Sequence, residues 1–196
     1  MSVLRKLFYP TSAWEPVAAE LGGKFVPGNF FKRAQIILRD GPHQLAVKAE
    51  LGKGDSRITY TKVIVESPLN PDVHLGLVRK TPGQGLMRRL ASMAGFGVDL
   101  PGLGDDSLVM ARDAQLAEHV FLRGTFLDAL GRAPESIAVQ VGGDLTKMDE
   151  ADSEISVSKQ GVITDRGELA AMVALIRALL DSLQEAGCLE AGGRAP

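Results

Sequence analysis

The chain has 196 residues, a formal net charge of −2 at pH 7 and a hydrophobic fraction of 45%. This length can bury a core without disulfides or metals, and the balance of charge argues against a nucleic-acid-binding protein, whose affinity comes largely from clustered Lys and Arg. The single cysteine, Cys188, excludes an internal disulfide. The N-terminus lacks the pattern of a signal peptide and no apolar run is long enough for a transmembrane segment, so we expect a soluble, cytoplasmic protein.

The first half of the chain predicts a short helix and then a group of strands. The helix contains Trp14 and ends at Gly22 and Gly23. From there the apolar residues alternate with polar ones, which indicates strands. We expect them at 34–38, 45–49, 57–66 and 73–79, preceded by a short strand at 24–26. The connections are too short for crossover helices, so the four longer strands are predicted to form an antiparallel meander.

The stretch from Thr81 to Asp106 differs in composition from both flanks. It contains six glycines, and connections of this length are commonly functional or disordered. The spacing of Leu86, Leu90 and Met93 predicts one short amphipathic helix within it. We expect this helix to dock through those three residues, while the glycine-rich ends act as hinges. The segment is therefore predicted to be a Gly/Met-rich insertion or flap at 81–106.

The second half predicts a strand at 107–111, a helix from Asp113 to Leu130, and two strands that contain 137–141 and 155–157. A polar surface loop, Leu145 to Asp152, joins the last two strands into a hairpin. The C-terminal helix, from Asp165 to Gly187, has apolar residues at helical spacing on more than one side. Asp165 followed by Glu168 has the spacing of a capping box.

This order predicts an α+β fold in one domain over residues 1–196. The antiparallel sheet, a four-stranded meander plus a C-terminal hairpin, is expected to pack against two or three helices with the C-terminal helix central. The arrangement loosely resembles that of bacterial α+β proteins with no assigned function. No catalytic or binding motif in the sequence identifies a family.

Motifs for metal or cofactor chemistry are absent from the sequence. The histidines at positions 43, 74 and 119 have no partner at a metal-ligand spacing, and no phosphate-binding glycine motif occurs. We therefore expect no metal and no cofactor. Cys188 follows a helix-ending glycine, and the helix dipole there would raise the pKa of its thiol, so a catalytic role is not expected.

The predicted function is a non-catalytic binding or interaction module for an unknown apolar ligand or protein partner. Basic pairs at Arg79-Lys80 and Arg88-Arg89 bracket the start of the 81–106 segment, whose methionines are typical of adaptable contact surfaces. A simpler interpretation is a short helix that packs its apolar face on the sheet edge. The candidate ligand-binding or partner-binding residues are Leu86, Met87, Arg88, Arg89, Leu90, Met93 and Phe96.

An alternative function is an enzyme whose site is assembled from scattered residues around the 81–112 loop. Active sites often combine residues that are distant in the sequence, so the missing motifs weaken this alternative without excluding it. Its candidate residues are His74, Asp105, Asp106 and Arg112.

Overall fold

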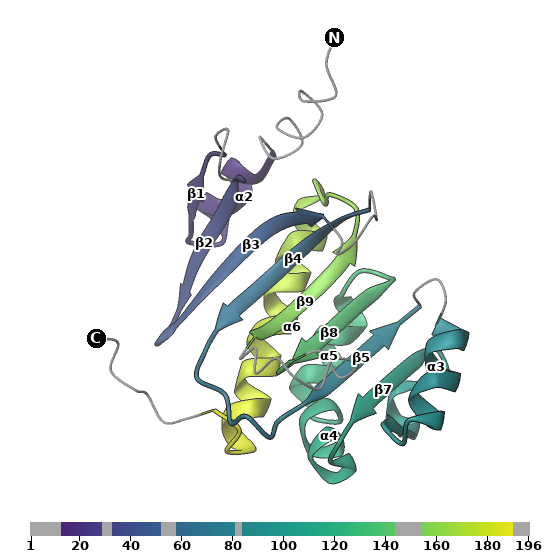
Figure 1. Ribbon diagram of the computed structural model, residues 1–196. Helices are drawn as coiled ribbons and strands as arrows, with labels where there is room; N and C mark the ends of the chain where they lie inside the picture. Colours follow the sequence, from purple (N-terminus) through teal and green to yellow (C-terminus); the bar gives the residue numbers. More distant parts are fainter. Residues whose placement is uncertain (1–12, 29–32, 52–57, 81–83, 144–153, 190–196) are drawn as a thin grey trace.

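The computed structural model describes residues 13–28, 33–51, 58–80, 84–143 and 154–189. Its strands form one antiparallel sheet in the order β1-β2-β3-β4-β9-β8-β5-β7-β6 (Figure 1). The strands are β1 (Lys24–Val26), β2 (Gln35–Asp40), β3 (His43–Leu51), β4 (Thr59–Glu66), β5 (Leu75–Arg79), β6 (Gly97–Val98), β7 (Ser107–Ala111), β8 (Ile137–Val141) and β9 (Glu154–Gln160).

The helices divide unequally between the two faces of this sheet. Four of them contribute buried residues to the large core on one face: α2 (Trp14–Glu20), α4 (Ala114–Phe121), α5 (Gly124–Arg132) and α6 (Arg166–Glu185). Helix α3 (Gln84–Met93) packs on the other face against β6 and β7. A short 3-10 helix, η2 (Pro101–Leu103), precedes β7.

Alternation along the strands separates the two apolar clusters. Leu77 belongs to the large core, whereas its neighbour Val78 belongs to a small cluster on the opposite face. Successive side chains of a strand point to opposite faces. On β7, Val109 accordingly belongs to the large core and Leu108 to the small cluster. The small cluster also contains Ala91 of α3, so α3 covers the second face only near β5 and β7.

The predicted α+β fold is confirmed, with α6 packed against the sheet. Asp165 caps this helix by accepting a hydrogen bond from the backbone N–H of Glu168 at 2.8 Å. Trp14 is fully buried, and its indole N–H donates to the carbonyl of Ile163 at 2.7 Å. This bond joins α2 to the residues that lead into α6, so the N-terminal helix and the C-terminal helix share one core.

The meander comprises β1 to β4, so its outermost strand is the short one at 24–26. The predicted fourth strand, β5, lies elsewhere, because the β8–β9 hairpin separates it from β4. From β4 to β5 the chain crosses three inter-strand spacings, roughly 14 Å at about 4.8 Å each. The eight residues from Ser67 to His74 can reach about 26 Å when extended. The connection is therefore long enough to reach a strand that is not adjacent to β4, which is why the predicted placement of β5 as the fourth strand of the meander is wrong.

The single helix expected from Asp113 to Leu130 is wrong, since the structure divides it into α4 and α5. Arg123 has an extended backbone between them, with φ −66° and ψ 137°. The rings of Phe121 and Phe126 lie 5.3 Å apart across the break, and both are fully buried. The change of direction between the helices thus lets an aromatic residue from each one pack into the same core.

The surface loop expected at Leu145 to Asp152 lies outside the described residues. Among the residues that the structure does describe, none of the helices combines the length and the apolarity that a bilayer span requires.

Candidate functional site

Helix α3 presents its large apolar side chains to solvent. The exposed fractions are 65% for Leu86, 38% for Met87, 56% for Leu90 and 86% for Met93. Over the described parts of the chain, these four account for most of the exposed large hydrophobic residues, with Leu51 and Ile58 as the others. We call Leu86, Met87, Leu90 and Met93 the exposed stripe. Concentrated exposure of this kind marks interaction sites on proteins more often than scattered single residues do.

The inner side of α3 is small and polar. Ala91 is the buried residue of the helix. The side-chain amide of Gln84 donates to the carbonyl of Asp106 at 2.7 Å and to that of Val78 at 3.3 Å. The guanidinium of Arg88 donates to the carbonyls of Asp105 at 2.9 Å and Ser107 at 2.8 Å. The helix is therefore held to the sheet largely by hydrogen bonds to backbone carbonyls.

The expectation that this helix docks through Leu86, Leu90 and Met93 is wrong. At 3.6 residues per turn, Leu86 and Met93 lie on the side of the helix away from Ala91. Carbonyl groups near β5 and β7 need hydrogen-bond donors if water is to be displaced, and Gln84 and Arg88 supply those donors. Satisfying these carbonyls takes the polar side of α3 inward and leaves Leu86, Leu90 and Met93 outward, with the less exposed Met87 at the edge of the stripe.

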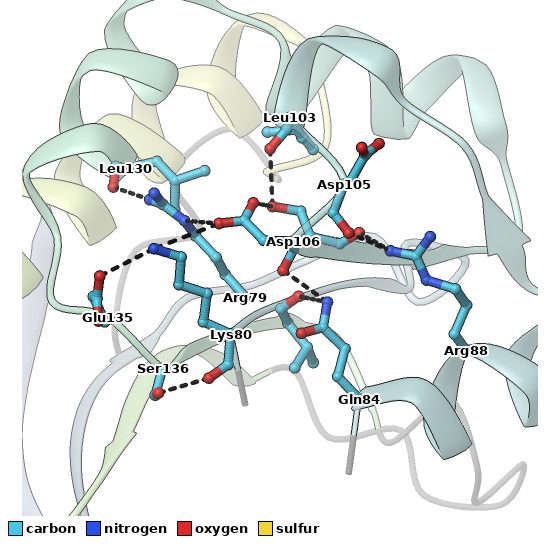
Figure 2. Close-up of polar contacts among 12 residues, drawn as sticks. Arg79, Lys80, Gln84, Arg88, Leu103, Asp105, Asp106, Leu130, Glu135 and Ser136 are labelled. Carbon is cyan, nitrogen blue, oxygen red and sulfur yellow. Dashed lines mark hydrogen bonds and ion pairs between the residues drawn. The ribbon is translucent and has the colours of Figure 1, made fainter. Parts of the chain in front are cut away.

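A network of charged groups connects the start of α3 to the loop before β8 (Figure 2). Lys80 donates from its ammonium to the carboxylate of Glu135 at 3.0 Å and lies 3.8 Å from that of Asp106. The guanidinium of Arg79 lies 3.6 Å from the carboxylate of Asp106 and donates to the carbonyl of Leu130 at 2.8 Å. The hydrogen bond and the charge of Lys80 lower the pKa of Glu135. These half-exposed pairs position the loops more than they stabilise the fold.

Two residues of this network have a left-handed backbone. The φ angles are 49° at Lys80 and 60° at Ser136, both unusual for residues other than glycine. The Ser136 hydroxyl donates to the carbonyl of Lys80 at 2.7 Å (Figure 2). The pair fixes the backbone at the end of β5. Sequence reasoning missed Gln84 and Ser136. The turn itself gave no signal, because neither Lys80 nor Ser136 is the glycine that usually marks a positive φ.

The structure places the other candidate residues of the site around the same helix. Arg89 is exposed, three positions after Leu86 and four before Met93, so it lies beside the stripe. Phe96 is half-buried, and its N–H donates to the carbonyl of Ala91 at 2.9 Å. Arg88 is exposed too, and its guanidinium is hydrogen-bonded to the carbonyls of Asp105 and Ser107. All seven residues belong to one local unit, and their binding role stays a prediction.

The four candidate enzyme residues are not brought together. Strand pairing aligns Leu75 with Ala111 and Arg79 with Ser107. His74 therefore lies at one end of the β5–β7 pair, where Arg112 also lies, and Asp106 lies at the other end. From Leu75 to Arg79 the strand makes four residue steps, which separates the two ends by about 14 Å.

A shallow open depression of about 620 Å³ lies beside α4 and the end of α6, away from α3. An ion pair between Arg123 and Glu185 lines it and lowers the pKa of Glu185. Burial, followed by the charge of Asp113, raises the pKa of the Cys188 thiol. The direction agrees with expectation, although burial is its main cause. Among the described residues, no group of three His, Cys, Asp or Glu side chains could hold a metal ion.

The site must be interpreted from its own geometry, because comparisons with known proteins supply no precedent. No protein-family model, curated protein or solved structure matches the chain significantly.

Proposed function

We propose that the chain is a non-catalytic interaction module that contacts its partner through the exposed stripe of α3. The observation that carries this proposal is the reversed orientation of the helix. Its small and polar residues, Ala91, Gln84 and Arg88, face the sheet, and Leu86, Leu90 and Met93 face solvent. An amphipathic helix that served the fold alone would bury its apolar side.

The size of the stripe sets the energy that a partner could gain. Complete burial of a Leu or Met side chain gives roughly 1.5–3 kcal/mol. Scaled by the exposed fractions, covering the four side chains gives on the order of 5 kcal/mol. Association costs an estimated 4–15 kcal/mol in lost freedom of motion. The stripe is therefore a centre of contact, and a stable complex needs further contacts around it.

The support of α3 suits such a role. Gln84 and Arg88 hold the helix at two points one turn apart, and the bond from Ser136 holds Lys80 at the end of β5. A contact helix on a constrained support loses little freedom when it binds. The outward stripe is thereby offered in a fixed direction.

Gel filtration of extracts from cells that produce the protein tests this proposal. The natural chain, followed by an antibody, should elute ahead of the position of its 20.9 kDa monomer. The triple variant Leu86→Gln, Leu90→Gln, Met93→Gln should elute as a monomer, because it loses the apolar contact while keeping the polar support.

The double variant Leu51→Gln, Ile58→Gln is the matched control, since it removes exposed apolar residues elsewhere on the molecule. It should elute like the natural chain. Elution of the natural chain as a monomer, or an equal shift in both variants, would contradict the proposal.

A further inference from the structure

The charge around the exposed stripe is segregated from that of the rest of the chain. From Gln84 to Val98 the sequence contains Arg88 and Arg89 and no carboxylate, although the whole chain has a net charge of −2. Arg88 points inward to the carbonyls of Asp105 and Ser107. Both arginines are exposed, and Arg89 lies beside the stripe. The outer surface of α3 is thus apolar with a positive side.

A second copy of this chain fits that surface poorly. A ten-residue helix is about 15 Å long and about 10 Å across, and two such convex surfaces meet along a narrow line. The contact is far smaller than the roughly 800 Å² that each partner buries in a stable complex. Two copies of α3 would also offer Arg89 no carboxylate, since the helix has none.

A membrane surface fits it poorly as well. Helices that lie in the bilayer interface typically carry Trp or Phe on the apolar side and several Lys or Arg on the polar side. Helix α3 contains neither Trp, Phe nor Lys, and one of its two arginines is engaged with backbone carbonyls. The negative net charge of the chain also opposes approach to anionic lipid.

We infer that the stripe is covered by a partner protein with an apolar groove and carboxylates along one rim, an inference that rests on the proposed function. A groove encloses a helix from both sides, which enlarges the contact beyond that of two convex surfaces. Leu86, Leu90 and Met93 have the i, i+4, i+7 spacing of anchors in helix-in-groove recognition. Arg89 lies where a rim carboxylate would meet it, and such pairing favours the correct partner and orientation.

Photo-crosslinking in cells that produce the protein tests this inference on the full chain. A benzophenone amino acid placed at position 90 should form one covalent adduct with a larger protein, and the same residue at position 51 should not. Peptide mapping should place the crosslink in a segment of that protein that carries apolar residues beside Asp or Glu. Arg89→Glu should reduce the adduct yield several-fold, whereas Arg39→Glu, an exposed arginine on β2, should leave it unchanged.

Each other outcome overturns the inference in an identifiable way. An adduct of twice the mass of the chain would identify a second copy, and a phospholipid adduct would identify a membrane surface. A protein adduct that is insensitive to Arg89→Glu, or that maps to a segment without carboxylates, would exclude an acidic rim. These four results contradict the inferred groove with an acidic rim while leaving contact through the exposed stripe intact. No adduct at position 90 or at position 93 would overturn both.

Discussion

The same substitution on two helices should have very different consequences. Leu90 on α3 is 56% exposed, whereas Leu179 on α6 is fully buried. Replacing each with glutamine changes helix propensity little, because both amino acids favour helices to a similar degree. Any difference in stability between Leu90→Gln and Leu179→Gln therefore reports how much each side chain is packed.

The magnitudes follow from burial. Leu179→Gln loses about 2 kcal/mol of apolar transfer and buries an amide without a partner at a further cost of about 2 kcal/mol. For a chain of this size, 1 kcal/mol corresponds to about 2–4 °C in melting temperature, so a fall of roughly 8–16 °C is expected. Leu90→Gln loses less than half of the transfer term, since most of the side chain is in water, so its fall should stay within about 4 °C.

Thermal unfolding followed by circular dichroism measures both variants against the natural chain. Nearly equal falls in melting temperature would refute the reasoning, because they would mean that Leu90 packs against the fold. A fall confined to Leu179→Gln would agree with an outward stripe.

Three further predictions concern the turn at β8, the support of α3 and the buried thiol. Gly142 has φ +80°, and a Cβ there would collide with the Val73 carbonyl, so Gly142→Ala should lower the melting temperature. Gly131→Ala lies in open space on α5 and should raise the melting temperature by about 2–4 °C, because alanine is favoured over glycine in helices by roughly 1 kcal/mol. Equal effects would contradict the turn geometry. Arg88→Met should speed hydrogen exchange across α3 without changing exchange in α6, and unchanged exchange in α3 would show that the carbonyl bonds do not hold the helix. Cys188 should resist iodoacetamide at pH 8 until the chain unfolds, because burial keeps the thiol covered and raises its pKa; rapid modification of the folded protein would contradict its buried position.

Local patterns predicted the elements well where one face of each is buried. The C-terminal helix follows its apolar spacing and its Asp165 cap, and both are confirmed. The strands follow their alternation, since a half-buried strand must place apolar residues on one face. The pairing partner of β5 could not be predicted in this way, because β8 and β9 lie much later in the chain and only the tertiary fold places them between β4 and β5.

The sequence predicted the helix at α3, but not which of its sides faces the sheet. The spacing of Leu86, Leu90 and Met93 gives an amphipathic helix whichever side faces the sheet. Orientation depends on the carbonyls near β5 and β7, which Gln84 and Arg88 satisfy. Those acceptors are backbone groups, so the pattern of side chains in the sequence does not predict where they lie. The left-handed backbone of Lys80 at the end of β5 likewise has no signal in the sequence.

The central claim is that the apolar side of α3 faces solvent. The accessibility of cysteines placed along the helix tests this claim most directly. In a Cys188→Ala background, Leu90→Cys and Ala91→Cys place one thiol at adjacent positions of the same helix. The alkylation rate of the folded Leu90→Cys protein should be close to that of the unfolded chain, whereas Ala91→Cys should react many times more slowly because position 91 is 7% exposed. Slow alkylation at position 90 together with fast alkylation at position 91 would show that the stripe packs on the sheet, and would contradict the proposed function.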